Sequence, residues 1–311
     1  MVKNARILEN KSKIELPNMG LGLAAIQNTL ELWQQGYFEG INSVAEMGSQ
    51  ELHVTGEDFR NLIQQACLPD NEKYNFPGLD NWPSKPRCSA KHLYRMLGAP
   101  NYDCFDLNKE HGAIEHDLNH PIVDTGLYGK YDLVTDHGSC EHVFNIAEAY
   151  RTMHSLCKQG GFLVISQALW GGNGYFHYDK PFFEGIAAAN GYRIIFDSYV
   201  ICLKRTTMGK SQQQFHVPLS SGLLQAIDLG DVDEIGVYAV LEKLLDGEFK
   251  FPYQGNYLAQ RQHNAGFNRV YYRDPPAYSY IPEYTNDNAS HISGRTLAVE
   301  LLQRLKAKIS W

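Results

Sequence analysis

The segment over residues 131–167 limits the possible folds most strongly. An apolar stretch at 132–135 ends in a polar, histidine-rich turn, and an amphipathic helix is predicted over 145–158. The glycine pair at 160–161 then precedes a second apolar stretch over 162–167. A strand, a helix and a second strand in this order form a βαβ unit, which requires a parallel pair. Open α/β sheets bind ligands at the carboxyl ends of such strands, so the polar turn marks a candidate site.

The same segment carries a family resemblance. Residues 131–143 read Tyr-Asp-Leu-Val-Thr-Asp-His-Gly-Ser-Cys-Glu-His-Val, and residues 158–165 read Lys-Gln-Gly-Gly-Phe-Leu-Val-Ile. Both closely resemble the middle of class I S-adenosylmethionine-dependent methyltransferases, and the resemblance covers about 43–244. It implies a Rossmann-like fold, S-adenosylmethionine as the cofactor and methyl transfer as the reaction. After its first strand the family has the pattern E-x-G-x-G-x-G, of which this chain keeps Glu46 and Gly48 but not the later glycines.

Composition and charge limit the classes of molecule that the protein is expected to bind. The chain has 311 residues, 43% of them hydrophobic, a net charge of −7 and no block of basic residues. An extended nucleic-acid interface is therefore not expected, and a small-molecule substrate is. No apolar run is long enough to span a membrane, and no signal peptide is recognisable at the start. Six cysteines without a CxxC pair favour a reduced, cytoplasmic protein. A homodimer is the assembly that we consider for this chain.

Alternating strand and helix patterns predict an α/β fold, a doubly wound Rossmann-like sheet that is mostly parallel and seven-stranded. We expect an N-terminal helical segment over 1–42, a core over 43–245 with an insertion near 54–88, and a C-terminal extension over 246–311. Strands are predicted at 43–47, 101–107, 113–118, 132–135, 162–167, 192–203 and 236–241. Helices are predicted at 21–35, 57–67, 89–97, 145–158, 181–190 and 294–308.

The resemblance also assigns cofactor-binding positions. It places Glu46, Gly48, Ser49 and Gln50 at the amino-acid end of the cofactor, Asp106 at the ribose, Asp117 and Leu118 at the adenine, and Asp136 at the sulfonium. The residues alone leave other roles open. Asp106 is also typical of a solvated strand end, and Asp117 of a turn.

Three histidines are candidate catalytic residues. His177 lies in a glycine-rich loop, and His137 and His142 lie in the polar turn; each is able to take a proton from a hydroxyl group. Structural roles for His142 and for its neighbour Glu141 remain open, as does anchoring of the loop by His177. The tight spacing of His137, Cys140 and His142 does not meet the four-ligand requirement of zinc, so we predict no metal.

The sequence therefore predicts methylation of a small polar acceptor, more specifically O-methylation of a sugar or secondary metabolite. N-methylation is an alternative. Another is a catalytically idle nucleotide-binding scaffold or partner subunit, because the glycine loop is incomplete. A nicotinamide-dependent oxidoreductase would require G-x-G-x-x-G after the first strand, which the segment after Gly48 lacks.

Overall fold

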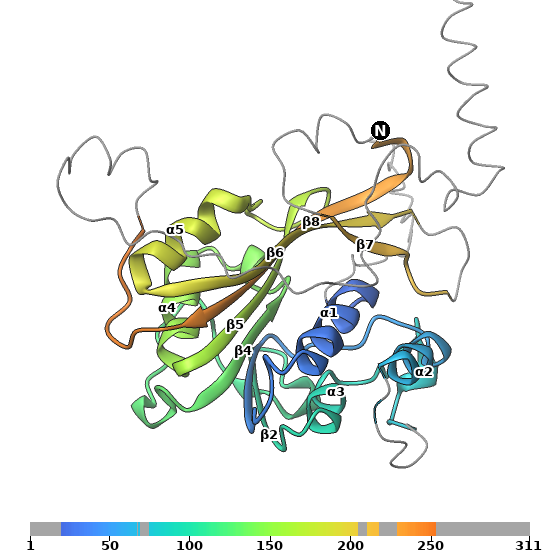
Figure 1. Cartoon of the computed structure of the whole chain (residues 1–311), viewed down its shortest axis with the longest axis horizontal. Coiled ribbons are helices and arrows are strands. Elements are labelled where there is room, and N and C mark those ends of the chain that lie inside the picture. Colours follow the sequence, from blue (N-terminus) through green and yellow to red (C-terminus); the bar gives the residue numbers. More distant parts are fainter. Residues whose placement is uncertain (1–19, 67, 69–74, 205–209, 218–228, 253–311) are drawn as a thin grey trace, which may run out of the picture.

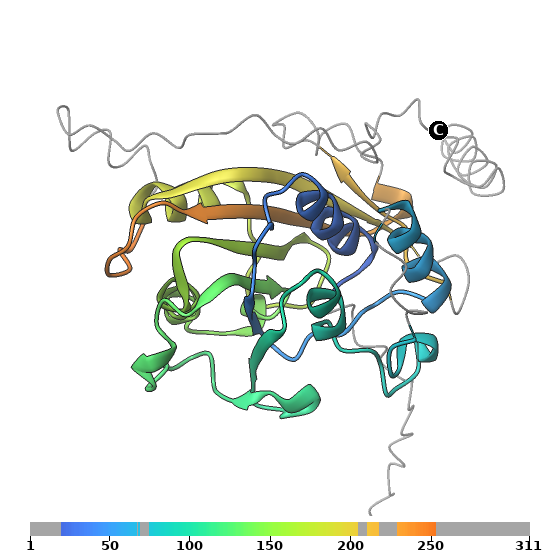
Figure 2. The ribbon, with the colours of Figure 1, turned by 60° about the horizontal axis from the view of Figure 1, so that its bottom comes forward.

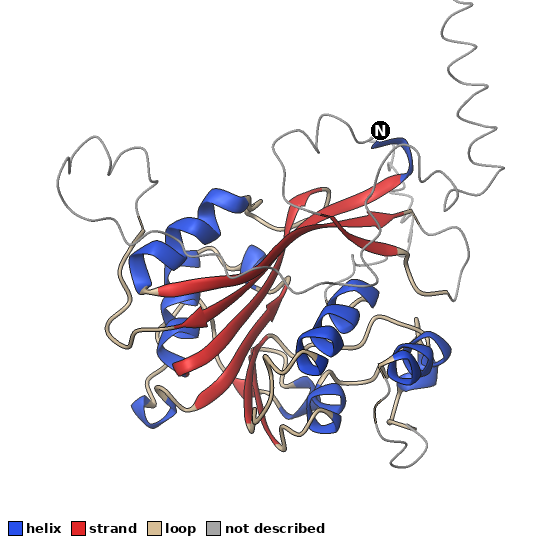
Figure 3. Ribbon diagram, viewed as in Figure 1, coloured by secondary structure: helices blue, strands red, loops and turns tan. Residues whose placement is uncertain are grey.

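The computed structural model describes residues 20–66, 68, 75–204, 210–217 and 229–252. Within them, one twisted mixed sheet carries helices on both faces (Figures 1 and 3). The expected helix over 294–308 lies outside the described residues, as do residues 1–19 of the segment 1–42 and residues 253–311 of the C-terminal extension. No helix of the described part is both long and apolar enough to cross a membrane.

The sheet has the strand order β3-β2-β1-β4-β5-β8-β6-β7. Its first five members in this order pair in parallel, and β8 is antiparallel to both β5 and β6. The strands are β1 (Ser43–Met47), β2 (Asn101–Asp106), β3 (Ile114–Glu115), β4 (Tyr131–His137), β5 (Cys157–Trp170), β6 (Tyr192–Leu203), β7 (Gln214–Val217) and β8 (Val232–Lys243). The doubly wound, mostly parallel Rossmann-like prediction is confirmed.

Two strand predictions need correction. The sheet has eight strands, because the short β7 adds to the edge of β6 in antiparallel pairing. In the sequence its four residues lie in a segment without a strand pattern. The third strand, expected over 113–118, is only two residues long. It stops early because Asp117 accepts hydrogen bonds from the backbone and side chain of Asn119 and turns the chain away.

The helices are α1 (Leu23–Gln34), α2 (Gly56–Gln65), α3 (Lys91–Met96), α4 (Ile146–Leu156) and α5 (Lys180–Asn190). The core residues of α1, α2 and α3 pack with Val44 and Leu133, whereas those of α4 and α5 pack with Ala45 and Val134. Successive strand residues point to opposite faces, so the two helix groups cover opposite sides of the sheet. Figure 2 shows α1, in dark blue, beside β6 and β8.

Candidate functional site

The turn after β1 is tight, as predicted. Gly48 has φ +82°, a conformation that favours glycine, and its N–H donates to the Phe105 carbonyl at 2.9 Å. The space beside Gly48 is filled by the protein, however. A Cβ atom there would overlap the Ser139 hydroxyl, and Gln50 closes the same space by donating to Ser139 Oγ at 2.6 Å and to the Met47 carbonyl at 3.1 Å. The close packing of Ser139 therefore accounts for a glycine at position 48, and the approach of a cofactor to Gly48, expected from the resemblance, stays a prediction.

Glu46 and Asp136 do not lie at the open edge of the sheet. Glu46 is fully buried, bonded to Tyr102 and Thr135, and burial raises its pKa from 4.5 to about 8. Asp136 is also fully buried, and its Oδ1 accepts from the backbone N–H groups of the following turn. Burial raises the Asp136 pKa to about 6. Both side chains therefore have structural partners within the fold, and their contacts with a cofactor stay predictions.

Asp106, by contrast, retains acceptor capacity at the edge. Its Oδ2 accepts from the Ser49 N–H at 2.8 Å, and its Oδ1 accepts from the Asn108 N–H at 3.1 Å. The Ser49 hydroxyl lies 3.1 Å from Asp106 Oδ2 and 2.9 Å from Asn108 Oδ1, so its single proton has an alternative acceptor. A carboxylate has about four lone-pair positions, which leaves one on each Asp106 oxygen. These two remaining acceptor positions fit the two adjacent hydroxyl groups of a ribose, each of which donates one hydrogen bond.

The two residues predicted to contact adenine, Asp117 and Leu118, have different surroundings in the structure. The Asp117 side chain is about a third exposed, and its Oδ1 is occupied by Asn119 at 2.8 and 2.9 Å. Those hydrogen bonds lower the Asp117 pKa. Leu118 is only 8% exposed and packs in the core with Phe105. Asp117 therefore forms the turn after β3, and its contact with adenine stays a prediction.

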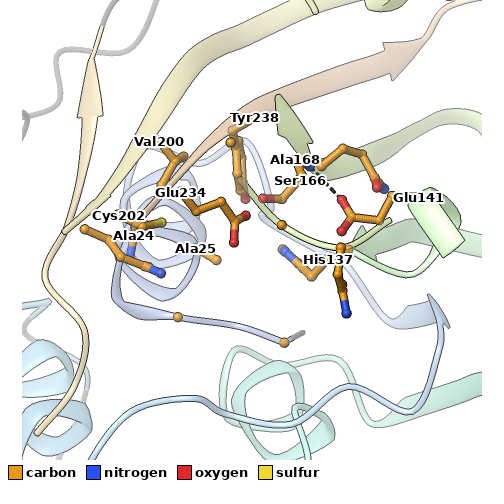
Figure 4. A pocket seen from close by; sticks show the side chains of 18 residues that line it. Ala24, Ala25, His137, Glu141, Ser166, Ala168, Val200, Cys202, Glu234 and Tyr238 are labelled. Carbon is orange, nitrogen blue, oxygen red and sulfur yellow. Dashed lines mark hydrogen bonds between the residues drawn. The ribbon is translucent and has the colours of Figure 1, made fainter. Parts of the chain in front are cut away.

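A cavity opens where β4, β5 and the start of β8 meet the first turn of α1. Its volume is about 60 Å³, whereas pockets for whole ligands hold about 300 to 1,000 Å³. The residues that line it include His137, Gly138, Glu141, Gln167, Glu234 and Tyr238. Figure 4 shows that β8, β5 and the turn after β4 all contribute to it. The cavity has room for one small reacting group and none for a complete nucleoside.

Two polar side chains in this cavity have unused hydrogen-bonding atoms. His137 is 3% exposed and neither ring nitrogen has a partner among the described residues. Gln167 is 2% exposed; its amide N–H donates to Asp136, and its Oε1 has no partner there. Burial lowers the His137 pKa to about 3, so the ring is neutral near pH 7. Buried polar atoms are nearly always paired, so these atoms indicate a ligand or bound water.

Two carboxyl groups face the same space. Glu141 Oε2 accepts from the Ala168 N–H at 2.7 Å, and the charges of Glu234 and Asp136 act on it. Burial raises the pKa of Glu141 to about 7, and burial together with Asp233 raises that of Glu234 to about 7. In Figure 4 both carboxyl groups point toward the interior of the pocket. Groups with a pKa near the working pH are suited to proton transfer.

Glu234 was missed by the sequence analysis. It begins an apolar strand after a long irregular segment, and only the pairing of β8 with β5 and β6 brings it to this edge. The one available signal was an acidic pair, Asp233 and Glu234, interrupting the start of an apolar run.

The other two candidate histidines lie away from the cavity lining. His177 is exposed, and its ring N–H donates to the Gly171 carbonyl at 3.2 Å, so it anchors the glycine-rich loop. His142 Nε2 lies 3.5 Å from Glu141 Oε1, and partial burial lowers the His142 pKa. Of the three histidines, only His137 lines the cavity.

The filled space at Gly48 has a testable consequence. Gly48→Ala is expected to lower the free energy of unfolding by about 3 kcal/mol, from the left-handed backbone plus overlap with Ser139. Gly138 is a matched control, since its φ is +83° but an added Cβ meets nothing within 4 Å. Gly138→Ala should cost about 1 kcal/mol, the backbone part alone. Urea unfolding measures both, and equal losses would contradict close packing at Gly48.

No family model matches the chain, and no curated protein matches it. Among solved structures, a Burkholderia thailandensis 1,6-didemethyltoxoflavin N1-methyltransferase, crystallised with S-adenosylhomocysteine, overlaps 70% of this chain and 78% of its own at 9% identity and a TM-score of 0.35. A putative methyltransferase from Bacillus halodurans (11% identity, TM-score 0.35, 69% of this chain and 96% of its own) is also similar. So is an S-adenosylmethionine-dependent methyltransferase from Archaeoglobus fulgidus (11%, 0.35, 69% and 94%).

The strand order and the parallel pairing of the chain itself define an open, Rossmann-like α/β protein with a polar edge.

Proposed function

We propose that the protein is an S-adenosylmethionine-dependent methyltransferase that acts on a small polar acceptor. The observation that carries this proposal is the position of Asp106 at the carboxyl edge of a Rossmann-like sheet, next to the Gly48 turn. When the Ser49 hydroxyl donates to Asn108, one acceptor position remains on each Asp106 oxygen. In that arrangement Asp106 binds the ribose hydroxyls. S-adenosylmethionine supplies an electrophilic methyl group on sulfur, so the protein mainly has to bind, orient and exclude water.

The reactive end belongs on the Gly138 side of the edge. The space at Gly48 is closed, whereas Gly138 lines the cavity and has open space beside it. The cavity next to Gly138 then receives the acceptor's reacting group. In this arrangement the nucleoside lies at Asp106 and the methyl acceptor lies beside His137. The polar turn after β4 separates the two.

The acceptor remains to be identified. O-methylation of a sugar or secondary metabolite, predicted from the sequence, relied on a histidine base, and His177 lies outside the cavity lining. His137 lines it but is a weak base, because burial lowers its pKa to about 3. The second candidate function is a catalytically idle scaffold, which is favoured by the closure of the Gly48 space by Gln50 and Ser139.

Isothermal titration calorimetry separates these functions. The full chain is expected to bind S-adenosylmethionine and S-adenosylhomocysteine with micromolar affinity, about −8 kcal/mol, and NAD at least about 100-fold more weakly. S-adenosylhomocysteine lacks the transferable methyl group, so its binding is measured without turnover. Binding of NAD alone would identify an oxidoreductase, and binding of none of the three would identify the idle scaffold.

A further inference from the structure

The cavity beside Gly138 has a distinct charge pattern. Two carboxyl side chains, Glu141 and Glu234, line it, and none of the residues that line it is lysine or arginine. The Glu141 carboxyl group accepts one backbone hydrogen bond, from the Ala168 N–H. Glu234 receives no hydrogen bond from the described residues, and burial together with the neighbouring Asp233 raises its pKa. An unpaired carboxylate in a partly buried site favours a cationic ligand, which compensates its charge.

Other observations indicate that a ligand, rather than protein packing, satisfies this site. The ring nitrogens of His137 and the Oε1 of Gln167 are buried, line the cavity and have no partner among the described residues. Gln167 Oε1 is an acceptor, and neutral His137 offers one further acceptor nitrogen. Together with the two carboxyl groups, they give the cavity four side chains with acceptor atoms, beside the Tyr238 hydroxyl and the single N–H of neutral His137. An ammonium group supplies only donors, so it complements this set.

We propose, on the basis of the methyltransferase function proposed above, that the acceptor is an amine and that Glu234 contacts its nitrogen and takes its proton. The sequence-based expectation of an oxygen acceptor is replaced by this proposal. Glu141, fixed by the Ala168 N–H, holds the second negative charge of the cavity and orients the ammonium group. The small volume of about 60 Å³ admits the amino group and a short part of its carbon chain.

The proton and charge balance is simple. The ammonium nitrogen transfers one proton to the ionised Glu234 carboxylate, which becomes a neutral acid, and the nitrogen recovers its lone pair. That lone pair forms the new bond to the methyl carbon while the methyl–sulfur bond breaks and its electrons remain on sulfur. The product nitrogen carries the positive charge that the sulfonium loses. Glu234 then returns its proton to water.

A hydroxyl acceptor does not suit these groups. A carboxylate whose pKa is about 7 takes a proton from an ammonium group of pKa about 10.4 across about three pKa units. An aliphatic hydroxyl, close to water at about 15.7, requires almost nine. Since neither Glu234 nor neutral His137 overcomes that difference, an amine is the acceptor class that this cavity is able to activate.

The test uses two small probes of almost equal shape, n-propylamine and n-propanol. Each is titrated calorimetrically into the full chain saturated with S-adenosylhomocysteine, in two buffers of different ionisation enthalpy. We expect n-propylamine to bind at least tenfold more tightly than n-propanol and to release protons at pH 7. Glu234→Gln should weaken n-propylamine at least tenfold and leave S-adenosylhomocysteine affinity within twofold. Glu248→Gln, an exposed site after β8 with the same charge change, is the control and should alter neither.

Raising the pH from 6 to 8 should tighten n-propylamine binding, because the carboxyl groups of Glu234 and Glu141 ionise in that range. The ionisable groups around them include Asp233, Asp136 and His142, His137 and Cys202 in the cavity, and Cys140 and Tyr178 beside Glu141. Equal affinity for both probes, no n-propylamine binding at about 0.1 M, or unchanged binding by Glu234→Gln would overturn the proposal. Failure of S-adenosylhomocysteine to bind would instead remove the methyltransferase function, whatever the amine result.

Discussion

Asp106→Asn is expected to weaken S-adenosylhomocysteine binding about 30-fold, which corresponds to about 2 kcal/mol. The variant keeps one side-chain oxygen but loses the charge and one of the two acceptor positions that face the ribose. Hydrogen bonds to a charged group contribute about 1.5 to 3 kcal/mol each, so the loss of one accounts for the effect. Titration calorimetry on wild type and variant measures it directly.

Asp106 also holds the loop after β1 through the Ser49 N–H, so a purely structural effect has to be separated. Adenosine and 2′,3′-dideoxyadenosine provide the distinction. Wild type should prefer adenosine at least tenfold, and Asp106→Asn should lose most of that preference. Ser49→Ala, which removes the hydroxyl and keeps the backbone N–H, should retain it. A preference that survives in Asp106→Asn would exclude ribose binding by this residue.

Glu46→Gln is expected to stabilise the protein, and by more as the pH rises. Burial raises the folded-state pKa of Glu46 from 4.5 to about 8. The folded protein therefore binds this proton more tightly than the unfolded chain, and the stability present below pH 4.5 is lost as the pH rises through about 8. A glutamine is never charged and avoids that loss. Relative to wild type, the variant should gain about 4 kcal/mol between pH 4 and pH 9.

Urea unfolding of wild type and variant at both pH values measures the difference between their free energies of unfolding. The titration of all other groups is the same in the two proteins and cancels in that difference. The exposed Glu248→Gln should show no comparable pH dependence. Glutamine has nearly the shape of glutamate, and Tyr102 and Thr135 remain as hydrogen-bonding partners. A variant that is less stable than wild type at pH 9 would show that Glu46 is needed as a charged group.

The positions of Glu46 and Asp136 illustrate why a family sequence pattern does not by itself predict where a side chain points. Glu46 shares its strand parity with Val44, which packs with α1, α2 and α3, so its side chain points under those helices. In β4, Asp136 shares the parity of Val134 and points toward α4, whereas His137 points to the opposite face and reaches the cavity. A motif position names a residue, but the strand parity and the packed helices decide where it points.

The sequence alone determined the order of the strands and helices other than β7, the βαβ unit over 131–167 and the tight turn at Gly48. Each of these follows from side-chain periodicity and turn chemistry, which are local. It also identified Asp106 and His137 as polar groups at strand ends, the positions that reach an open edge in a parallel sheet.

Only the tertiary structure decided which of those polar groups meet. Glu234 reaches His137 and Glu141 because β8 inserts between β5 and β6, with Cys202 opposite Glu234 in the pairing. Gln50 and Ser139 meet across β1 and β4 and close the space at Gly48. Both contacts join residues roughly ninety positions apart, and such pairings depend on strand register and packing, which short-range patterns do not encode.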